Sequence, residues 1–269
     1  MIDLSGKIAI ITGGGGGIGD AVARQFVKLG ARVGVAGRRA EVLKLLSQDC
    51  DVLPLTCDVS DPRSVDMAIS TLVDTFGGLD IIINNAGIAH GGTAEDISLA
   101  DWQMDLDVNL TGSLNVCKRG VPELKKRSGG AIVNVSSICG LTGALAVVSY
   151  SAAKAGMLGL SRSLARDYGK HNIRVNTICP GWVDTPMIQP PLQAFSLLHG
   201  VTMQEAKRML TRWSPLGRMS TPGEVANCIT FLASPASSFV SGAILVVDGG
   251  QSIVDLASLP MDPDAGIYS

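Results

Sequence analysis

The chain has 269 residues, which is long enough for one large domain or two small ones. Hydrophobic residues make up 46% of it and charged residues 17%, so we expect a sizeable core and not a disordered chain. The net charge of −2 argues against the strongly basic surface that binding to nucleic acid or to an acidic membrane requires.

Short β-branched runs alternate with helical patterns along the chain. The predicted strands are 8–12, 32–36, 52–55, 80–84, 131–136, 173–178 and 243–247. The predicted helices between them include 18–29, 62–76, 101–126, 149–169 and 222–233. Strands that alternate with helices of this length predict βαβ units, and the nearly continuous apolar strands predict a sheet buried on both faces. We therefore expect a single α/β domain over 1–269: a doubly wound, parallel sheet of about seven strands with helices on both faces.

The alternation stops between Pro180 and Pro222, where no clean strand is found. Four further prolines interrupt any long helix there: Pro186, Pro190, Pro191 and Pro215. One short helix is expected there, over 200–213. Because long irregular insertions in compact domains are usually functional, about 182–215 is predicted to be a lid over the substrate, with a plain surface excursion as the alternative.

The cysteines and the N-terminus point to the cytoplasm. Six cysteines lack a C-x-x-C pair and are expected to be buried thiols in a reducing compartment. The three histidines lack ligand spacing, so no metal site is predicted. Neither a signal peptide nor an apolar run of about 18 residues is found, which predicts no membrane partner.

Five consecutive glycines, Gly13 to Gly17, and a sixth at Gly19 follow the first predicted strand and open a helix. Ordering a glycine costs more backbone entropy than ordering any other residue. Glycine lets the backbone approach a pyrophosphate closely, and the helix N-terminus offers free N–H groups and the positive end of the dipole. Placed in a βαβ unit, this turn predicts a dinucleotide site; a turn needed only for packing is the alternative.

The end of the second predicted strand bears on the choice of dinucleotide. It lacks the acidic residue that binds the ribose of NAD(H) in the usual fingerprint, and Arg38 and Arg39 follow it instead. An arginine here can bind a 2′-phosphate through charge-assisted, bidentate hydrogen bonds. NADP(H) is therefore favoured as the cofactor, with NAD(H) as the alternative. The other explanation for the two arginines is that both are solvated residues at the start of the next helix.

Tyr150 and Lys154 are four residues apart and share one face of a predicted helix. A phenol has a pKa of about 10, and a nearby ammonium lowers it, so the pair suits proton transfer near neutral pH. Ser137 follows strand 131–136, and the sequence NNAG (84–87) ends strand 80–84. Ligands of parallel sheets bind at the carboxyl ends of the strands, so these residues are expected to converge there.

With these motifs the sequence resembles the short-chain dehydrogenases/reductases, in their shorter single-domain branch. The resemblance covers about residues 5–250. The matching motifs are Thr12-Gly13-x-x-x-Gly17-Ile18-Gly19, CDVSD (57–61), NNAG (84–87), VNLTG (108–112), VSS (135–137), Tyr150-x-x-x-Lys154 and PGWVDT (180–185). The resemblance implies a Rossmann-type fold and hydride transfer between a nicotinamide cofactor and a secondary alcohol or ketone.

The resemblance also implies roles for individual residues. Tyr150 looks like the general acid/base, and Lys154 looks like the residue that binds the nicotinamide ribose and lowers the pKa of Tyr150. Ser137 looks like the donor that holds the substrate oxygen, and Asn109 looks like the residue that keeps a water in a proton relay. The cofactor-binding residues implied are Gly13, Gly17, Ile18, Gly19, Arg38, Asp58, Val59, Asn85, Gly87, Tyr150, Lys154, Pro180, Gly181, Val183 and Thr185.

Some assignments have alternatives, and the sequence departs from the family pattern twice. Ser136 is the alternative to Ser137 as the catalytic hydroxyl. The alternative for Asn109 is an ordinary residue at a helix kink, and the alternative for Asp58 is a residue that only forms a turn. Many NADP-preferring relatives carry a basic residue where this chain has Gly16, which leaves Arg38 to hold the phosphate. The tail, about 251–269, is longer than usual and is either disordered or in reach of a neighbouring subunit's site.

Other activities on this fold match the sequence less well. Epimerases and dehydratases of the extended branch are longer, and enoyl reductases space their Tyr and Lys more widely. A dehalogenase-like lyase would lack the glycine fingerprint. A non-catalytic dinucleotide-binding protein would lack at least one of Asn109, Ser137, Tyr150 and Lys154. The lyase and the non-catalytic protein are kept as alternatives.

The resemblance leaves the substrate open. The candidate pocket residues are mostly apolar: His90, Ile138, Cys139, Leu145, Val147, Trp182, Met187 and the lid over 195–213. They predict that the substrate is an uncharged, hydrophobic small molecule. Arg208 and Arg212 are the two basic residues that could bind a charged group, and the alternative is that both lie on a solvated helix face. Helices 101–126 and 149–169 resemble a four-helix interface and 239–250 a second contact, so a homotetramer is expected.

Overall fold

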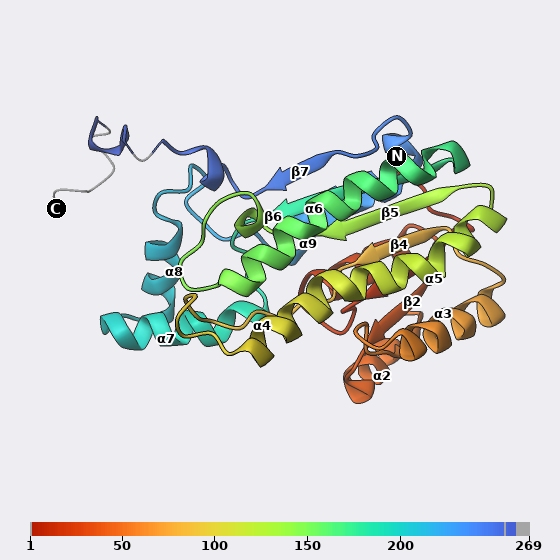
Figure 1. Cartoon of the computed structure of the whole chain (residues 1–269), viewed down its shortest axis with the longest axis horizontal. Coiled ribbons are helices and arrows are strands. Elements are labelled where there is room, and N and C mark those ends of the chain that lie inside the picture. Colours follow the sequence, from red (N-terminus) through yellow and green to blue (C-terminus); the bar gives the residue numbers. More distant parts are fainter. Residues whose placement is uncertain (1, 256, 262–269) are drawn as a thin grey trace.

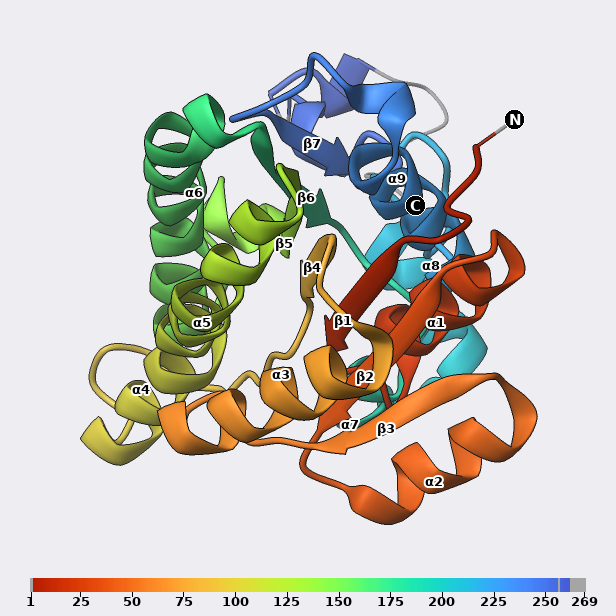
Figure 2. The ribbon, with the colours of Figure 1, turned by 90° about the vertical axis from the view of Figure 1, so that its right-hand side faces the viewer.

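One parallel sheet forms the centre of the molecule. The computed structural model describes residues 2–255 and 257–261. Within them the sheet has seven strands in the order β3-β2-β1-β4-β5-β6-β7 (Figures 1 and 2). The strands are β1 (Ile8–Thr12), β2 (Arg32–Gly37), β3 (Val52–Thr56), β4 (Ile81–Asn84), β5 (Gly130–Val135), β6 (Ile173–Pro180) and β7 (Ile244–Val247). All seven predicted strands are present, and the predicted fold class is confirmed.

Helices cover both faces of this sheet, as Figure 2 shows. On one face lie α1 (Gly17–Lys28), α2 (Ala40–Asp49) and α9 (Pro222–Ala233), and on the other lie α3 (Pro62–Phe76), α5 (Gly112–Lys126) and α6 (Val148–Tyr168). Side chains of β1 alternate between the two layers: Ala9 and Ile11 pack on the first, Ile8 and Ile10 on the second. This alternation explains why the strand is apolar throughout.

The sequence order of the strands reverses between β1 and β4, because β2 and β3 lie on one side of β1 and β4 to β7 on the other. In doubly wound sheets, ligands bind in the crevice outside the carboxyl ends of the strands at this point. Pro54 lies in β3, which is an edge strand, where a residue without an N–H group is tolerated.

The helix predicted over 101–126 is interrupted. It consists of α4 (Leu99–Leu106), a π-helical turn η1 (Asp107–Thr111) and α5. The Asn109 side chain donates hydrogen bonds to the carbonyl oxygens of Ile88 (2.8 Å) and Asp105 (2.9 Å). π-helical turns are frequent at functional sites. Hydrophobic periodicity could not predict this π-helical turn. The turn coincides with hydrogen bonds of one polar side chain, that of Asn109, and a pattern of apolar residues does not record such bonds.

The segment predicted as the lid contains two helices, α7 (Gln189–His199) and α8 (Met203–Thr211). The α8 helix matches the short helix expected over 200–213. The α7 helix was not predicted; Pro190 and Pro191 lie in its first turn, where a missing N–H group costs nothing. Both helices lie beyond the strand ends marked by the arrowheads in Figure 1. The function of a lid stays a prediction.

Short helical turns complete the described chain. They are η2 (Ile138–Gly140), η3 (Gly169–His171), η4 (Pro186–Ile188), η5 (Pro235–Ser237), η6 (Gln251–Ile253) and η7 (Leu259–Met261). The last two belong to the predicted tail, 251–269, of which residue 256 and 262–269 lie outside the described residues. None of the described helices combines the length and apolar character needed to cross a lipid bilayer.

Candidate active site

The glycine turn brings the backbone of β1 and α1 very close to the chain after β4. Gly13 and Gly17 have positive φ angles of 66° and 56°. A Cβ atom on Gly13 would lie 2.9 Å from the Ala86 Cα, and one on Gly19 would lie 2.3 Å from the Gly13 carbonyl oxygen. No side chain caps the N-terminus of α1. An open cradle with uncapped N–H groups fits a pyrophosphate.

The turn opens into a cavity of about 770 Å³ at the carboxyl ends of the strands. Most of the predicted site residues line it: Gly13, Gly17, Ile18, Arg38, Asp58, Val59, Asn85, Gly87, Ser137, Tyr150, Lys154, Pro180, Gly181, Val183 and Thr185. Gly19 and Asn109 do not. Gly19 instead packs against the backbone of the turn at Gly13, and its role toward a cofactor stays a prediction.

Arg38 marks the end of the cavity next to β2. The strand ends at Gly37, so no carboxylate follows it, and the Arg38 side chain is exposed. The hydroxyl of Ser60 and, to a smaller extent, the charge of Arg38 lower the pKa of Asp58. Since no acid directly follows β2, the Arg38 guanidinium leaves room and charge for a 2′-phosphate.

Tyr150, Lys154 and Ser137 meet at the other end of the cavity. The Lys154 ammonium lies 5.4 Å from the centroid of the Tyr150 ring and donates a hydrogen bond of 2.8 Å to the Val135 carbonyl oxygen. The Ser136 hydroxyl donates to the backbone carbonyl of Lys154 at 2.8 Å. That hydroxyl is therefore engaged in holding β5 to α6, and Ser137 is the better candidate for contact with a substrate.

The pKa of Tyr150 differs from the value expected from its lysine neighbour. Burial raises the pKa of the phenol above its usual range, with a smaller increase from Cys139, while the Ser137 hydroxyl acts in the opposite direction. The lowering expected from Lys154 is thus not seen, because the cost of removing the phenolate from water dominates the pKa of this phenol. Burial also lowers the pKa of Lys154 to about 8.

Asn109 is fully buried behind the cavity. Its side-chain oxygen accepts a hydrogen bond of 3.3 Å from the Ile88 N–H. A Cβ atom on Gly87 would lie 2.8 Å from that oxygen and 3.5 Å from the Lys154 ammonium. Asn109 is therefore placed beside Lys154, and its contribution to a water relay stays a prediction.

The substrate end of the cavity is mostly apolar. Of the predicted pocket residues, Ile138, Cys139, Leu145, Val147, Trp182 and Met187 line it. His90, Arg208, Arg212 and the helix residues 195–213 are not among the residues that line it, and a contact of any of them with substrate stays a prediction. Arg212 packs over the Trp213 ring, 4.2 Å from its centroid. The charged side chains that do line the cavity are Arg38, Arg39, Asp58 and Lys154.

Several lining residues were missed from the sequence. Gly37, Val42, Leu43 and Cys57 line the end near β2, and Thr142, Gly143, Ala144, Pro191 and Gln251 line the substrate end. The residues after β2 lie next to Arg38 in the chain, so proximity could have indicated them. Gln251 carried no signal, because it reaches the site from beyond the last strand.

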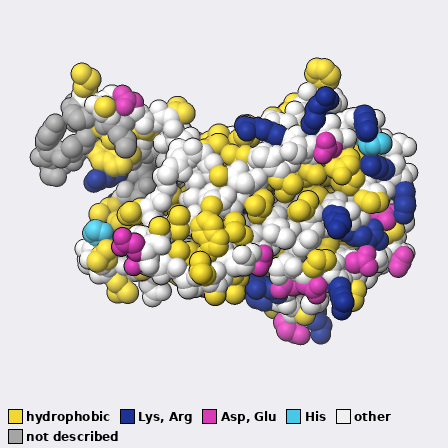
Figure 3. Space-filling view, viewed as in Figure 1, with side chains coloured by type: hydrophobic (Ala, Val, Ile, Leu, Met, Phe, Trp, Pro, Cys, Tyr) yellow, Lys and Arg dark blue, Asp and Glu magenta, His cyan; other side chains and the backbone are white. Residues whose placement is uncertain are grey.

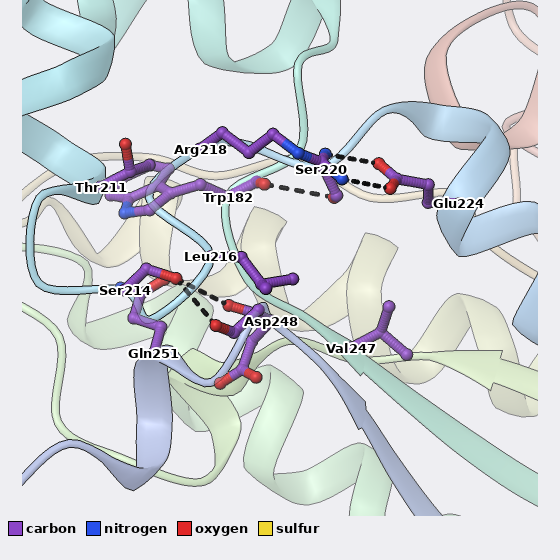
Figure 4. Close-up of a pocket in the computed structure, with 11 residues that line it drawn as sticks. Trp182, Thr211, Ser214, Leu216, Arg218, Ser220, Glu224, Val247, Asp248 and Gln251 are labelled. Atoms are coloured by element: carbon purple, nitrogen blue, oxygen red, sulfur yellow. Dashed lines mark hydrogen bonds and ion pairs between the residues drawn. The ribbon is translucent and has the colours of Figure 1, made fainter.

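A smaller hollow of about 90 Å³ lies behind Trp182 (Figure 4). Its charged and polar groups bond to one another: Arg218 pairs with Glu224 at 2.6 Å, and the Ser220 hydroxyl donates to the Trp182 carbonyl at 3.3 Å. Trp182 and Gln251 line both this hollow and the main cavity. The residues around this hollow therefore support the loop that carries Gly181 and Trp182.

Comparison with known proteins gives consistent results. A family model described as Enoyl-(Acyl carrier protein) reductase matches residues 14–252. The chain is 37% identical over 255 residues to the 3-oxoacyl-(acyl-carrier-protein) reductase FabG of Chlamydia muridarum, covering 93% of this chain and 98% of that protein. A short-chain type dehydrogenase/reductase from Mycobacterium marinum superimposes with a TM-score of 0.85 at 32% identity, covering 94% of this chain and 98% of that one.

A solved variant of actinorhodin polyketide ketoreductase with NADPH is similar as well. Its TM-score is 0.88 at 32% identity, over 92% of this chain and 98% of that one. The chain belongs to the short-chain dehydrogenase/reductase family. The predicted reaction class, NAD(P)-dependent interconversion of an alcohol and a ketone, is thereby confirmed, and the lyase and the non-catalytic protein are not favoured.

Proposed function

We propose that this protein is an NADPH-dependent reductase of uncharged, hydrophobic ketones. One observation carries the proposal. A single cavity joins an uncapped glycine turn, the Arg38 side chain and the group formed by Ser137, Tyr150 and Lys154. The bound dinucleotide would supply the hydride, and the protein's own residues would orient the substrate and move the proton.

The residues at the substrate end suit carbonyl reduction. Ser137 and Tyr150 would donate hydrogen bonds to the substrate oxygen and stabilise the negative charge that develops on it. Because burial raises the pKa of Tyr150, the phenol keeps its proton at neutral pH and can donate it. Lys154 and Asn109 would then serve the proton supply.

Arg38 supports NADP(H) over NAD(H). It is an exposed guanidinium beside the cavity, next to a strand that ends without an acid. Asp58 and Val59 would contact the adenine, while Pro180, Gly181, Val183 and Thr185 would hold the nicotinamide amide. Since Gly16 provides no second charge, Arg38 would bind the 2′-phosphate alone or with Arg39.

The apolar lining supports a substrate without charge. No acidic or basic side chain other than Lys154 lies among the described lining residues at that end. Leu145 and Met187, which also line the cavity, are exposed and extend the apolar surface outward. The four-residue spacing of Tyr150 and Lys154 favours carbonyl reduction over the enoyl reduction that the family model is named for.

We also infer a homotetramer, as the resemblance implied. On the face that Figure 3 shows, hydrophobic side chains gather where α5 and α6 lie, while charged side chains gather over α2 and α3. Sedimentation or light scattering at micromolar concentration tests this: a monomer mass would contradict it.

The assay that tests the function measures loss of NADPH absorbance with purified protein and a series of uncharged ketones of increasing chain length. We expect turnover that improves with apolar length, and little with ketones that carry a carboxylate. Tyr150→Phe should bind NADPH but lose about 100- to 10,000-fold in kcat. Tyr168→Phe, which alters a tyrosine stacked with Lys125 near the far end of the same helix, is the matched control. Comparable kcat for Tyr150→Phe would refute the proposal.

A further inference from the structure

A buried carboxylate lies beside the candidate site but outside the predicted tetrad. Asp105, in the last turn of α4, is 0% exposed. Its two oxygens engage three groups: Oδ1 lies 2.7 Å from His90 Nδ1, and Oδ2 accepts from the His90 N–H at 3.2 Å and from the Ser149 hydroxyl at 2.5 Å. Burying a charge is costly unless it is paired and hydrogen-bonded, so an apolar residue would pack here at lower cost.

The partners of Asp105 belong to the elements that carry the tetrad. His90 lies in the chain after β4, two residues beyond Ile88, whose backbone holds the Asn109 side chain. The Asp105 carbonyl oxygen itself accepts from the Asn109 amide at 2.9 Å. Ser149 directly precedes Tyr150 in α6. One residue therefore connects the chain after β4, the helix that leads to Asn109 and the helix that carries Tyr150.

The hydrogen bond from Ser149 to Asp105 is made in the first turn of α6, which has no side-chain cap. The helix begins at Val148, and no side chain caps its N-terminus. First turns without a cap fray, since their N–H groups lack partners. In the first turn the Ser151 N–H donates to the Val147 carbonyl at 2.9 Å. The bond from Ser149 to Asp105 anchors this turn, and the position of the Tyr150 ring depends on it.

We propose that Asp105, held by His90 and Ser149, is a positioning residue that fixes Asn109 and the first turn of α6 relative to each other. The inference rests on the proposed function for its kinetic consequences. It assigns no contact with substrate or cofactor to Asp105 or His90, neither of which lines the cavity.

The charge of Asp105 also reaches the proton-transfer pair. It contributes to raising the pKa of Tyr150 and opposes the lowering of the pKa of Lys154 by burial, because a carboxylate favours the protonated form of both groups. The charged or titratable groups around it are His90 from the chain after β4, Asp101 from α4, which lies 3.7 Å from His90 Nε2, and Tyr150 and Lys154 from α6.

The decisive variant is Asp105→Asn. An amide has one accepting oxygen and cannot receive all the hydrogen bonds that the carboxylate receives. We expect kcat to fall by about 10- to 100-fold because Tyr150 and Asn109 shift, while KM and NADPH binding stay near wild type. The kinetic pKa of the Tyr150–Lys154 pair should move to lower pH, which loss of packing alone would not cause. Asp107→Asn is the control: its carboxylate binds the Gln103 amide at 2.8 Å, near the surface.

A second measurement does not depend on turnover. Hydrogen exchange over 148–154 should be about tenfold faster in Asp105→Asn and in Ser149→Ala than in wild type, since the first turn loses its anchor. Ser149→Thr keeps the hydroxyl and should restore slow exchange and kcat. Ser149→Ala removes one bond only, so it stays informative if Asp105→Asn does not fold.

Three results would overturn the inference. The first is that Asp105→Asn keeps the wild-type kcat and the wild-type rate of hydrogen exchange, and the second is that Asp107→Asn loses as much kcat as Asp105→Asn. The third is a kcat that falls only in proportion to thermal stability while the pH profile stays unchanged. If wild-type protein reduces no ketone, the proposed function fails, and exchange over 148–154 alone then decides the role of Asp105.

Discussion

Lys154 and Val135 are joined by a hydrogen bond of 2.8 Å between the buried ammonium and the last carbonyl oxygen of β5. The bond ties α6 to the strand from which Ser137 projects. A second bond, from the Ser136 hydroxyl to the Lys154 carbonyl, runs in the opposite direction between the same two elements. The two serines at the end of β5 therefore serve different purposes: Ser136 holds α6, and Ser137 is left to face the cavity.

Substitution of each serine should separate these roles. Ser137→Ala removes a donor aimed at the substrate oxygen, and we expect kcat to fall by about 100- to 1,000-fold with little change in stability. Ser136→Ala should cost about 1 kcal/mol in the free energy of unfolding and should affect kcat much less. Urea unfolding and steady-state kinetics of both variants provide the comparison. The reverse pattern would make Ser136 the substrate donor.

Arg38→Ala should change the preference between cofactors. Losing a charge-assisted contact with a 2′-phosphate should weaken NADPH binding by about 10- to 100-fold and leave NADH binding unchanged. Nicotinamide fluorescence during titration measures both. Arg39→Ala shows whether the neighbouring guanidinium, which lines the same end of the cavity, shares in binding the phosphate. Tighter binding of NADH, indifferent to Arg38, would show that NAD(H) is the cofactor.

Stability should depend on pH through Lys154. Its pKa is about 8 in the folded protein, whereas a lysine in the unfolded chain has a pKa of 10.5, so between these pH values the unfolded chain binds more protons. The free energy of unfolding therefore rises with pH in this window, by up to about 1.4 kcal/mol per pH unit. Below pH 8 both states are protonated and the effect levels off.

Urea unfolding of wild type and Lys154→Met between pH 6 and 9.5 isolates this contribution, since other titrating groups cancel in the difference. We expect the difference to be flat up to about pH 7 and then to favour wild type increasingly. The window ends near pH 10, where Tyr150, whose pKa is raised in the folded state, begins to act in the opposite sense. A flat difference to pH 9.5 would mean that the ammonium is better solvated than its burial indicates.

Gly19→Ala should destabilise the fold itself. The added methyl would overlap the Gly13 carbonyl oxygen at 2.3 Å, a backbone atom that cannot move without displacing the turn. We expect a loss of about 2 kcal/mol or more and weaker dinucleotide binding. Gly223→Ala is the control: this exposed position in the first turn of α9 has its nearest neighbour atom at 3.9 Å. Thermal denaturation of the two variants tests the difference.

Much of the site could be predicted because its residues lie at strand ends. Tyr150 and Lys154 were paired by helical spacing, and Ser137, Asn85 and Gly87 by the strands that precede them; all of them line one cavity. His90 was expected among the pocket residues, yet its ring contacts Asp105. The direction of a side chain after a strand end depends on neighbours that the local sequence does not contain.

The sequence by itself determined the α/β fold, the seven strands of the sheet and the identity of most residues at its carboxyl edge. Buried parallel strands leave a continuous apolar signal, and a glycine turn after a strand permits few backbone paths. Only the tertiary structure decided the raised pKa of Tyr150, the π-helical turn at Asn109 and the bonds of Asp105 to His90 and Ser149. Desolvation and hydrogen bonding between residues distant in the chain arise only when the elements pack, so no local pattern records them.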